Sequence, residues 1–178
     1  GQELRTKTIY AIIIALLMII LFISWAFRKV SKPISSWKYG VIAIIALFHD
    51  ILIVLGIFVF LGKFFSIEVN APFVAALLTI LGYSVNDTIV IFDRVRENLK
   101  HYDYHFDNTV NKSVNQNFLR SVYTSVTTLL VLSSLYFFGG ETIKSFVLAL
   151  IIGVVIGTYS SIFLASPLLV VWEKLKRK

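Results

Sequence analysis

Five long apolar runs constrain this chain more strongly than any other feature of its sequence. About 20 apolar residues in a helix cross the hydrocarbon core of a bilayer, whereas a helix of a soluble protein interrupts its apolar residues with polar ones every third or fourth position. The sequence therefore predicts an all-α, polytopic membrane protein, a bundle of five transmembrane helices that forms a single domain, 1–178. The last run is the longest, so its helix is expected to tilt or to bend near Pro167. The predicted spans are Ile9–Phe27, Val41–Leu61, Pro72–Phe92, Phe118–Phe138 and Ser145–Val171.

The composition supports a lipid environment and excludes several kinds of chemistry. Charged residues make up only 15% of the chain and hydrophobic residues 57%, whereas soluble domains carry about a quarter charged residues. The absence of cysteine excludes disulfides, thiolate metal sites and a cysteine nucleophile. No nucleophile–base pattern, phosphate-binding loop or nucleophile elbow is present, so no enzyme activity is predicted. The chain begins at Gly1 without a signal-peptide pattern, which indicates a piece of a longer polypeptide.

The distribution of lysine and arginine predicts the orientation of the bundle, because cytoplasmic loops are enriched in these residues. Twelve lie on one side of the five spans and four on the other, so the N-terminus is expected outside and the C-terminus in the cytoplasm. Trp25, Trp37 and Trp172 fall at the predicted inner boundary, as an aromatic belt does. The net charge of +7 therefore fits membrane lipid head groups and not a nucleic acid. The twelve are Arg28, Lys29, Lys32, Lys38, Arg94, Arg96, Lys100, Lys112, Lys174, Lys176, Arg177 and Lys178; the four are Arg5, Lys7, Lys63 and Lys144.

The sequence leaves two interpretations of the inner connection 93–117. Its four acidic residues match its four basic residues, and three aromatic residues alternate with polar ones. An interfacial segment and a solvated loop are equally compatible with this pattern. The aromatic residues are Tyr102, Tyr104 and Phe106.

Three charged side chains lie inside the predicted spans, where a charge costs about 2.5–3.5 kcal/mol. They are Asp50, Asp87 and Arg120. At 100° per residue, Asp87 belongs to a polar stripe on the third span, and Arg120 to a polar seam on the fourth span that would face a neighbouring helix. The stripe contains Thr79, Tyr83, Asn86, Asp87 and Arg94, and the seam contains Ser113, Asn117, Arg120, Thr124 and Thr127.

We expect Asp87 and Arg120 to face each other in the inner half of the membrane, because the third span ends there and the fourth begins there. In a functional interpretation, protonation of Asp87 removes the attraction and lets the two helices shift, as intramembrane carboxylates do in proton relays. In a structural interpretation, the pair is a fixed brace, and Thr and Asn side chains supply interhelical hydrogen bonds. Position alone favours the functional interpretation and leaves the structural one open.

The histidines do not predict a metal site. His49 precedes Asp50, but adjacent side chains point about 100° apart on a helix. We therefore expect Asp50 to face the bundle and His49 to be a satisfied polar residue. His101 and His105 are one helical turn apart, and no further ligand-spaced residue accompanies them.

A small residue recurs at every fourth position of the last span, which lets a neighbouring helix backbone approach closely. The sequence therefore predicts a helix-packing face there. Its residues are Ser145, Ala149, Gly153, Gly157, Ser161 and Ala165.

The segment Gly82–Asn98 resembles the signature of the SecF family of bacterial protein-export proteins. The resemblance continues in the family's order over the whole chain and implies the family's transmembrane helices two to six, with an RND-like arrangement in the cell (inner) membrane. It also implies that the family's first helix and exported domain are absent from this sequence. The further matching segments are Gly1–Arg5, Leu47–Leu52, Phe138–Glu141 and Gly157–Pro167.

The resemblance implies an accessory subunit of the Sec translocase with SecD as its obligatory partner. Such a module uses the proton gradient to draw preproteins across the membrane after a motor ATPase has pushed them through the SecYEG channel, and it needs no cofactor besides protons as coupling ion. Carried over by motif, Asp87 corresponds to the essential proton-coupled carboxylate, Arg120 to the intramembrane arginine and Asp50 to a third member. YajC and YidC are further implied partners, and the preprotein would contact the missing exported domain.

Two alternatives stay open beside this expectation. An RND-type exporter of small solutes should bind its solute in a large exported portion, and the short outer loops 62–70 and 139–144 offer no such site. A structural scaffold in the translocase would support export normally with the neutral pair Asp87→Asn and Arg120→Gln. A separate SecF and the second half of a fused SecDF fit the sequence equally.

Overall fold

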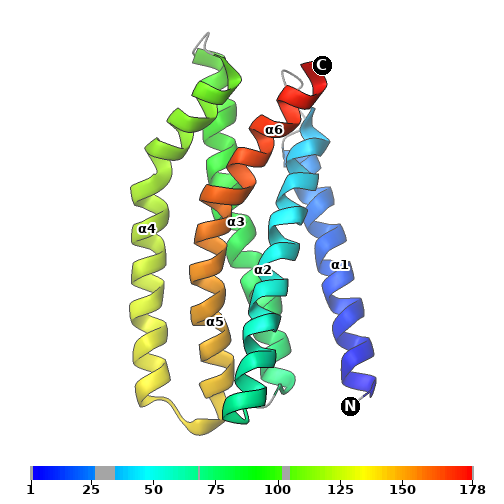
Figure 1. The fold of residues 1–178 in the computed structure, drawn as a ribbon, viewed down its shortest axis with the longest axis vertical. Coiled ribbons are helices and arrows are strands. Elements are labelled where there is room, and N and C mark those ends of the chain that lie inside the picture. The colour runs from blue at the N-terminus through cyan, green and yellow to red at the C-terminus, as the bar shows by residue number, and fades with distance from the viewer. Residues whose placement is uncertain (1, 27–34, 68, 102–104, 178) are drawn as a thin grey trace.

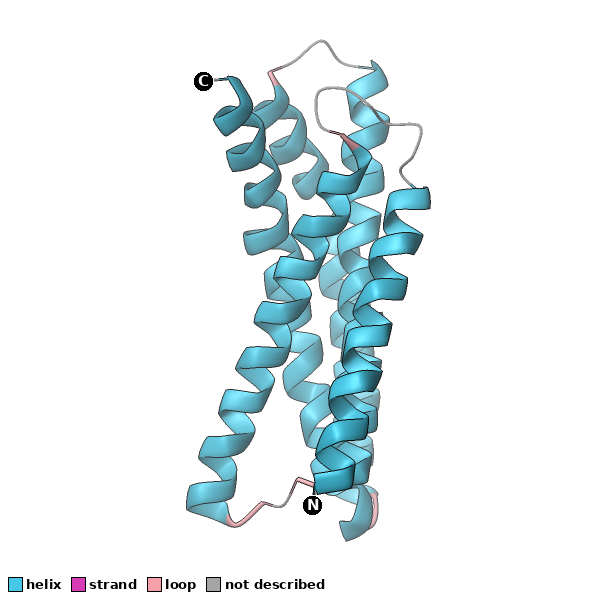
Figure 2. Ribbon diagram, turned by 90° about the vertical axis from the view of Figure 1, so that its right-hand side faces the viewer, coloured by secondary structure: helices cyan, strands magenta, loops and turns pink. Residues whose placement is uncertain are grey.

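Long antiparallel helices form the bundle in the computed structural model, which describes residues 2–26, 35–67, 69–101 and 105–177. Successive long helices run in alternate directions, so the two termini lie at opposite ends of the bundle (Figure 1). The last turns of α1 and α3 and the first turns of α2 and α4 share the end that carries the C-terminus, called here the C-terminal end (Figures 1 and 2). The helices are α1 (Gln2–Ala26), α2 (Ser36–Phe65), α3 (Ala71–His101), α4 (Phe106–Phe138), α5 (Glu141–Ser160), the π-helical η1 (Ser161–Ala165) and α6 (Ser166–Arg177).

The predicted fold class is confirmed. Within the described residues, five helical stretches are long and apolar enough to cross a membrane, and the fifth joins α5, η1 and α6. Each stretch matches one predicted span, and the structure continues most of them into the neighbouring polar residues. The stretches are Thr6–Ala26, Trp37–Phe65, Ala71–Lys100, Phe106–Phe138 and Glu141–Leu175.

The connection predicted over 93–117 is largely helical, contrary to the interpretation as a solvated loop. α3 continues to His101 and α4 begins at Phe106, because the two helices extend side by side and bury side chains against each other. The amide Nδ2 of Asn98 donates a 2.8 Å hydrogen bond to Ser113 Oγ across this contact, and Phe106 is only 3% exposed. Tyr102, Tyr104 and the side chain of His101 lie outside the described residues.

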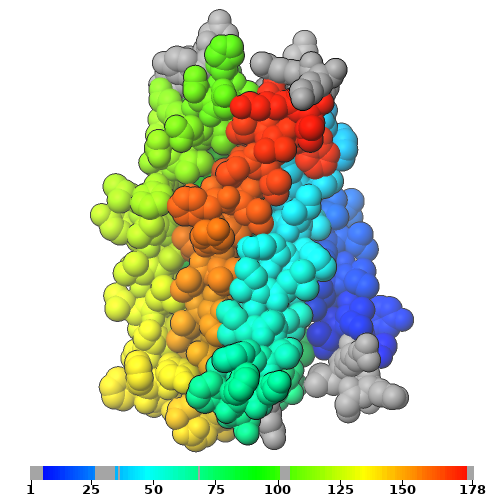
Figure 3. All heavy atoms as spheres, viewed as in Figure 1, coloured from blue at the N-terminus to red at the C-terminus, as the bar shows by residue number. Residues whose placement is uncertain are grey.

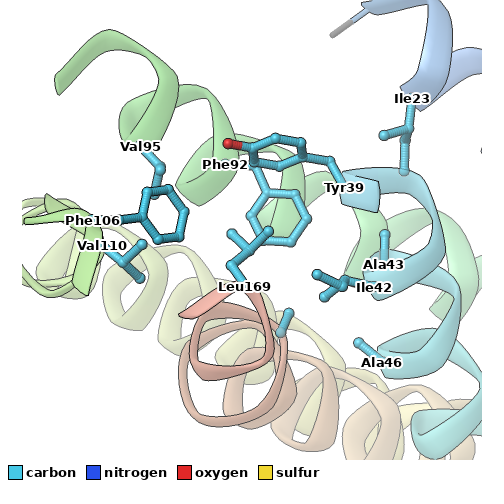
Figure 4. Close-up of a cluster of buried hydrophobic side chains, with 11 residues drawn as sticks. Ile23, Tyr39, Ile42, Ala43, Ala46, Phe92, Val95, Phe106, Val110 and Leu169 are labelled. Atoms are coloured by element: carbon cyan, nitrogen blue, oxygen red, sulfur yellow. The ribbon is translucent and has the colours of Figure 1, made fainter. Parts of the chain in front are cut away.

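The apolar core has two main parts, separated along the bundle by a polar layer. The part near the C-terminal end joins side chains of α1, α2, α3, α4, η1 and α6 (Figure 4), including Tyr39 and Phe92, whose ring centroids are 5.3 Å apart. The other part is centred on Phe58 and Phe73, at 4.4 Å between centroids. Between them along each helix lie buried Asp50, Ser84, Thr88, Ser160 and Ser161.

The small-residue face of α5 packs directly against α3. A methyl group added at Gly153 would overlap the side chain of Ile80. One added at Gly157 would lie 3.0 Å from Ser84 Cβ. The two helix backbones therefore approach closely where α3 carries its buried polar residues.

The last span is interrupted where the sequence predicts a tilt or a bend. η1 is one wide turn that ends two residues before Pro167, and α6 then leans away from the direction of α5 (Figure 1). A proline lacks the N–H for the usual helical bond, and its ring clashes with the preceding turn. The wider turn of η1 makes room for the proline ring. The Ser166 hydroxyl donates a 2.9 Å hydrogen bond to the carbonyl of Ser161 in this turn.

Candidate functional site

Asp50 is fully buried in the middle of α2 and is held by hydroxyls from two other helices. Its Oδ2 accepts hydrogen bonds from Ser84 Oγ of α3 at 2.5 Å and from Ser160 Oγ of α5 at 2.8 Å. The Nδ1 of neighbouring His49, whose side chain is about one-third exposed, lies 3.2 Å from Oδ1. Because a buried carboxylate is costly unless it is hydrogen-bonded, these three contacts explain how α2 carries it.

Asp87 lies on α3, half-buried, and its two oxygens have different surroundings. Ser121 of α4 donates a 2.6 Å hydrogen bond to Oδ1. The other oxygen, Oδ2, is buried and has no donor within hydrogen-bond distance in the described part of the chain, although the Ser161 hydroxyl lies close enough to interact with this carboxyl group. Asp87 is thus attached to α4 through a serine and keeps one buried acceptor position unfilled.

Arg120 does not form the direct ion pair with Asp87 that the sequence predicts. The two side chains, both described, interact electrostatically at longer range. Arg120 lies on the exposed side of α4, and so do Thr124 and Thr127, whose hydroxyls bond to carbonyls of their own helix. The predicted seam therefore differs from the one that packs.

The packed seam of α4 is rotated by one residue from the predicted one. Its members recur at every fourth position and are buried, so the seam shares only Ser113 and Asn117 with the prediction. Ser121 takes the place expected for Arg120 because a short hydroxyl fits between closely packed helices, whereas a guanidinium does not. The packed seam is Thr109, Ser113, Asn117, Ser121 and Ser125.

A second group of hydroxyls joins α3, α4 and α5 one turn away from Asp87. Tyr83 OH lies 3.2 Å from Ser125 Oγ, which is also hydrogen-bonded to Thr158 Oγ1 at 2.5 Å. Of the predicted stripe on α3, Tyr83 and Asp87 contact hydroxyls of α4, whereas Thr79 and Asn86 are exposed.

Ser160 and Ser161 connect the surroundings of the two carboxylates. Ser160 reaches Asp50, and Ser161 Oγ lies 2.8 Å from Thr88 Oγ1 and donates to the carbonyl of Ser84 at 3.5 Å. The sequence prediction assigned Ser161 to packing alone. The junction of α5 and η1 therefore contacts both α2 and α3 through consecutive hydroxyls.

Sequence reasoning missed the hydroxyls that hold the carboxylates. A usable signal was present: Ser84 precedes Asp87 by three residues and Thr88 by four, so all three share one side of α3. Likewise, the pair Ser160-Ser161 interrupts an apolar run. We call the set the carboxylate layer: Asp50, Ser84, Asp87, Thr88, Ser121, Ser160 and Ser161.

A polar cavity of about 300 Å³ lies between α3 and α4 on the C-terminal side of Asp87. Arg94, also predicted on the polar stripe, donates hydrogen bonds there to Gln116 Oε1 at 2.7 Å and to Glu97 Oε2 at 2.6 Å. Arg120 and Asn117 line the same cavity. Among the described residues, no three carboxylates or histidines gather in a way that could hold a metal ion.

Fold and site together define a polytopic α-helical membrane protein with two acidic side chains inside its bundle. Within that class, the chain belongs to the family "Protein export membrane protein SecD/SecF, C-terminal". The model of this family matches residues 1–175. The protein translocase subunit SecF of Thermobaculum terrenum is 58% identical over 174 residues, which are 97% of this chain and 54% of that protein. The protein translocase subunit SecDF of Thermus thermophilus is 43% identical over 99% of this chain and 23% of its own length.

A solved structure has the same fold. The crystal structure of SecDF in a "Super-membrane-facing form" aligns with a TM-score of 0.83 and 41% identity, over 99% of this chain and 23% of that chain. The present chain thus spans about half the length of its SecF relative and about a quarter of the SecDF chains.

Proposed function

We propose that this chain is the membrane part of a proton-coupled accessory subunit of the Sec translocase, which assists late steps of preprotein export. The observation that carries the proposal is Asp87, an acidic side chain inside a membrane bundle with one buried oxygen that accepts no hydrogen bond within the described chain. Intramembrane carboxylates mark ion and proton pathways in membrane proteins. The role is transport, and it involves no covalent chemistry.

The contacts of Asp87 suggest how a proton could move helices. As a carboxylate, Asp87 accepts the Ser121 hydrogen bond and attracts Arg120, so α3 and α4 are held together. Protonation removes the charge, weakens both interactions and relaxes the contact between the helices. Asp50, with three polar neighbours, is the second carboxylate of the relay and anchors α2 to α3 and α5.

The exposed polar face of α3 and α4 supports SecD as the direct partner. Arg120 and its polar neighbours lie within spans, yet they are uncovered in this chain. Ionisable side chains in membranes face a bundle interior or an aqueous cavity, so we propose that SecD, as a separate subunit or a fused half, covers this face. SecYEG and the preprotein, with YajC and YidC, are partners of the larger assembly. The other exposed residues are Thr79, Asn86, Thr124 and Thr127.

The proposed orientation places the C-terminal end of the bundle in the cytoplasm and the N-terminus outside, in a bacterial cell membrane. It rests on the lysine and arginine excess at the C-terminal end. In this orientation the polar cavity beside Arg120 lies in the cytoplasmic half of the bundle.

The test is preprotein export in cells that carry Asp87→Asn in the full-length protein. We expect the stimulation of export by the proton gradient to fall to the level of cells without the subunit. Asp93→Asn is the matched control on the same helix, because Asp93 is 55% exposed and its ion pair in the described chain is with Arg96, one turn away. Full stimulation in correctly inserted Asp87→Asn protein would refute the relay.

A scaffold remains the second candidate, because interhelical hydroxyl contacts such as Ser125–Thr158 also serve packing. The double variant Asp87→Asn with Arg120→Gln separates the two functions. Normal proton-stimulated export in this variant supports the scaffold, whereas loss supports the relay. The similarity to translocase subunits favours preprotein export over a small-solute exporter.

A further inference from the structure

A lysine held by two tryptophans lies where α2 begins and α6 ends. The Nζ of Lys38 is 5.9 Å from the ring centroid of Trp37 and 5.3 Å from that of Trp172. The two indoles meet edge to face at 5.7 Å between centroids. In Figure 3 the red end of α6 lies directly against the cyan start of α2. Two helices thus fix one cation at the C-terminal end of the bundle.

Among the described residues, Lys38 has no acidic partner, unlike three other cations at this end of the bundle. Arg94, Arg96 and Lys174 each pair with a carboxylate, whereas in the described part of the chain Lys38 has none within 4 Å. The nearest acidic residue along α6, Glu173, falls on the opposite side of the helix from the face that Lys38 approaches. A half-buried ammonium between aromatic rings therefore keeps hydrogen-bond donors for an anion.

An apolar groove of about 520 Å³ continues from this lysine along α6. It is lined by one helical face at spacings of three and four residues, and Val171 and Leu175 on that face are 51% and 69% exposed. A free inorganic anion gains nothing from such a wall, whereas an acyl chain does. The lining residues are Lys38, Leu168, Val171, Trp172 and Leu175.

We propose that this groove is a binding site for one anionic phospholipid. Its phosphate lies on the ammonium of Lys38, the indoles of Trp37 and Trp172 sit at the level of the head groups, and an acyl chain runs from there into the membrane along Val171 and Leu168. Basic pockets between helices on the cytoplasmic side bind anionic head groups in this way. Only the choice of leaflet rests on the proposed orientation.

The experiment measures retention of phosphatidylglycerol by the full-length protein in its complex with SecD, using native mass spectrometry in detergent. Lys38→Gln should weaken binding of one lipid about fivefold, which corresponds to about 1 kcal/mol for one lysine at a membrane surface. Lys38→Arg should restore it. Lys63→Gln is the matched control, since Lys63 lies on the same helix over the ring of Phe64 at 5.6 Å, but at the other end.

Three further measurements distinguish a specific lipid site at Lys38 from general attraction to lysines, from binding of free phosphate and from binding of any phospholipid. Lys174→Gln, which removes an exposed lysine paired with Asp107, should leave phosphatidylglycerol retention unchanged, and inorganic phosphate at millimolar concentration should not displace the lipid. Equal retention of phosphatidylcholine, displacement by phosphate, or an equal loss in Lys174→Gln would each overturn the proposal. So would unchanged retention in Lys38→Gln.

Discussion

At the scale of single residues, the carboxylates of Asp50 and Asp87 are hydrogen-bonded to different degrees. Asp50 has polar neighbours at both oxygens, from its own helix and from α3 and α5. Asp87 has one hydroxyl donor and a buried oxygen without any in the described chain. An unsatisfied buried polar atom costs stability and is uncommon, which is why we propose a functional role for Asp87. Asp50 has the environment of an anchor.

Removal of one hydroxyl donor from Asp50 should destabilise the bundle. We expect Ser160→Ala to lower the free energy of unfolding of the full-length protein by about 1–3 kcal/mol, because a buried acceptor loses a short charged hydrogen bond. Ser134→Ala is the matched control, since Ser134 is an exposed serine of α4. Thermal unfolding in detergent measures both.

A double-mutant cycle assigns the effect to Asp50. In an Asp50→Asn background the cost of Ser160→Ala should shrink, because the serine then donates to a neutral amide oxygen. An undiminished cost would mean that Ser160 acts through its other bond, to the Gly157 carbonyl.

At the scale of helices, the spans were predictable and the packing faces only in part. The spans depend on local hydropathy, which can be read directly from the sequence. On α4, however, polar residues surround most of the helix, so two stripes offset by one residue share Ser113 and Asn117. Only the neighbours decide between Arg120 and Ser121, and they lie about 34 residues away in sequence, at Asp87. Such a choice cannot be read from the periodicity of one helix.

The close contact of α3 and α5 gives a prediction at this scale. Gly153→Ala should cost about 1–3 kcal/mol of stability, since the added methyl overlaps Ile80. Gly56→Ala is the matched control, with open space at its Cβ in the middle of α2, and it should be neutral or stabilise by up to about 1 kcal/mol. Thermal unfolding of the full-length protein measures both, and Ile80→Ala should reduce the cost of Gly153→Ala. If Gly153→Ala behaves like Gly56→Ala, the two helices do not pack this closely.

At the scale of the whole molecule, most of the lysines and arginines lie at one end of the bundle. The five spans alternate in direction, so the segments that join the first span to the second and the third to the fourth lie at the same end as the C-terminus. The starts of α2 and α4 and the end of α6 share that end, together with the Lys38–Trp172 groove and the polar cavity beside Arg120. The orientation in the membrane therefore decides in which half of the membrane the cavity and the groove lie. It is the premise on which the direction of any proton movement depends.

Single-cysteine labelling tests this orientation, because the chain contains no cysteine of its own. In a full-length protein otherwise free of cysteine, Gly140→Cys in the exposed α4–α5 turn should react with a membrane-impermeant maleimide on intact spheroplasts. Asn108→Cys, exposed in the first turn of α4, should react only after the membrane is permeabilised. Both positions lie on the same helix or at its end, so their difference reports the side and not the local fold. The opposite labelling pattern would invert the orientation and turn the cavity beside Arg120 outward. Equal labelling of both variants on sealed spheroplasts would contradict the proposal that α4 spans the membrane between them.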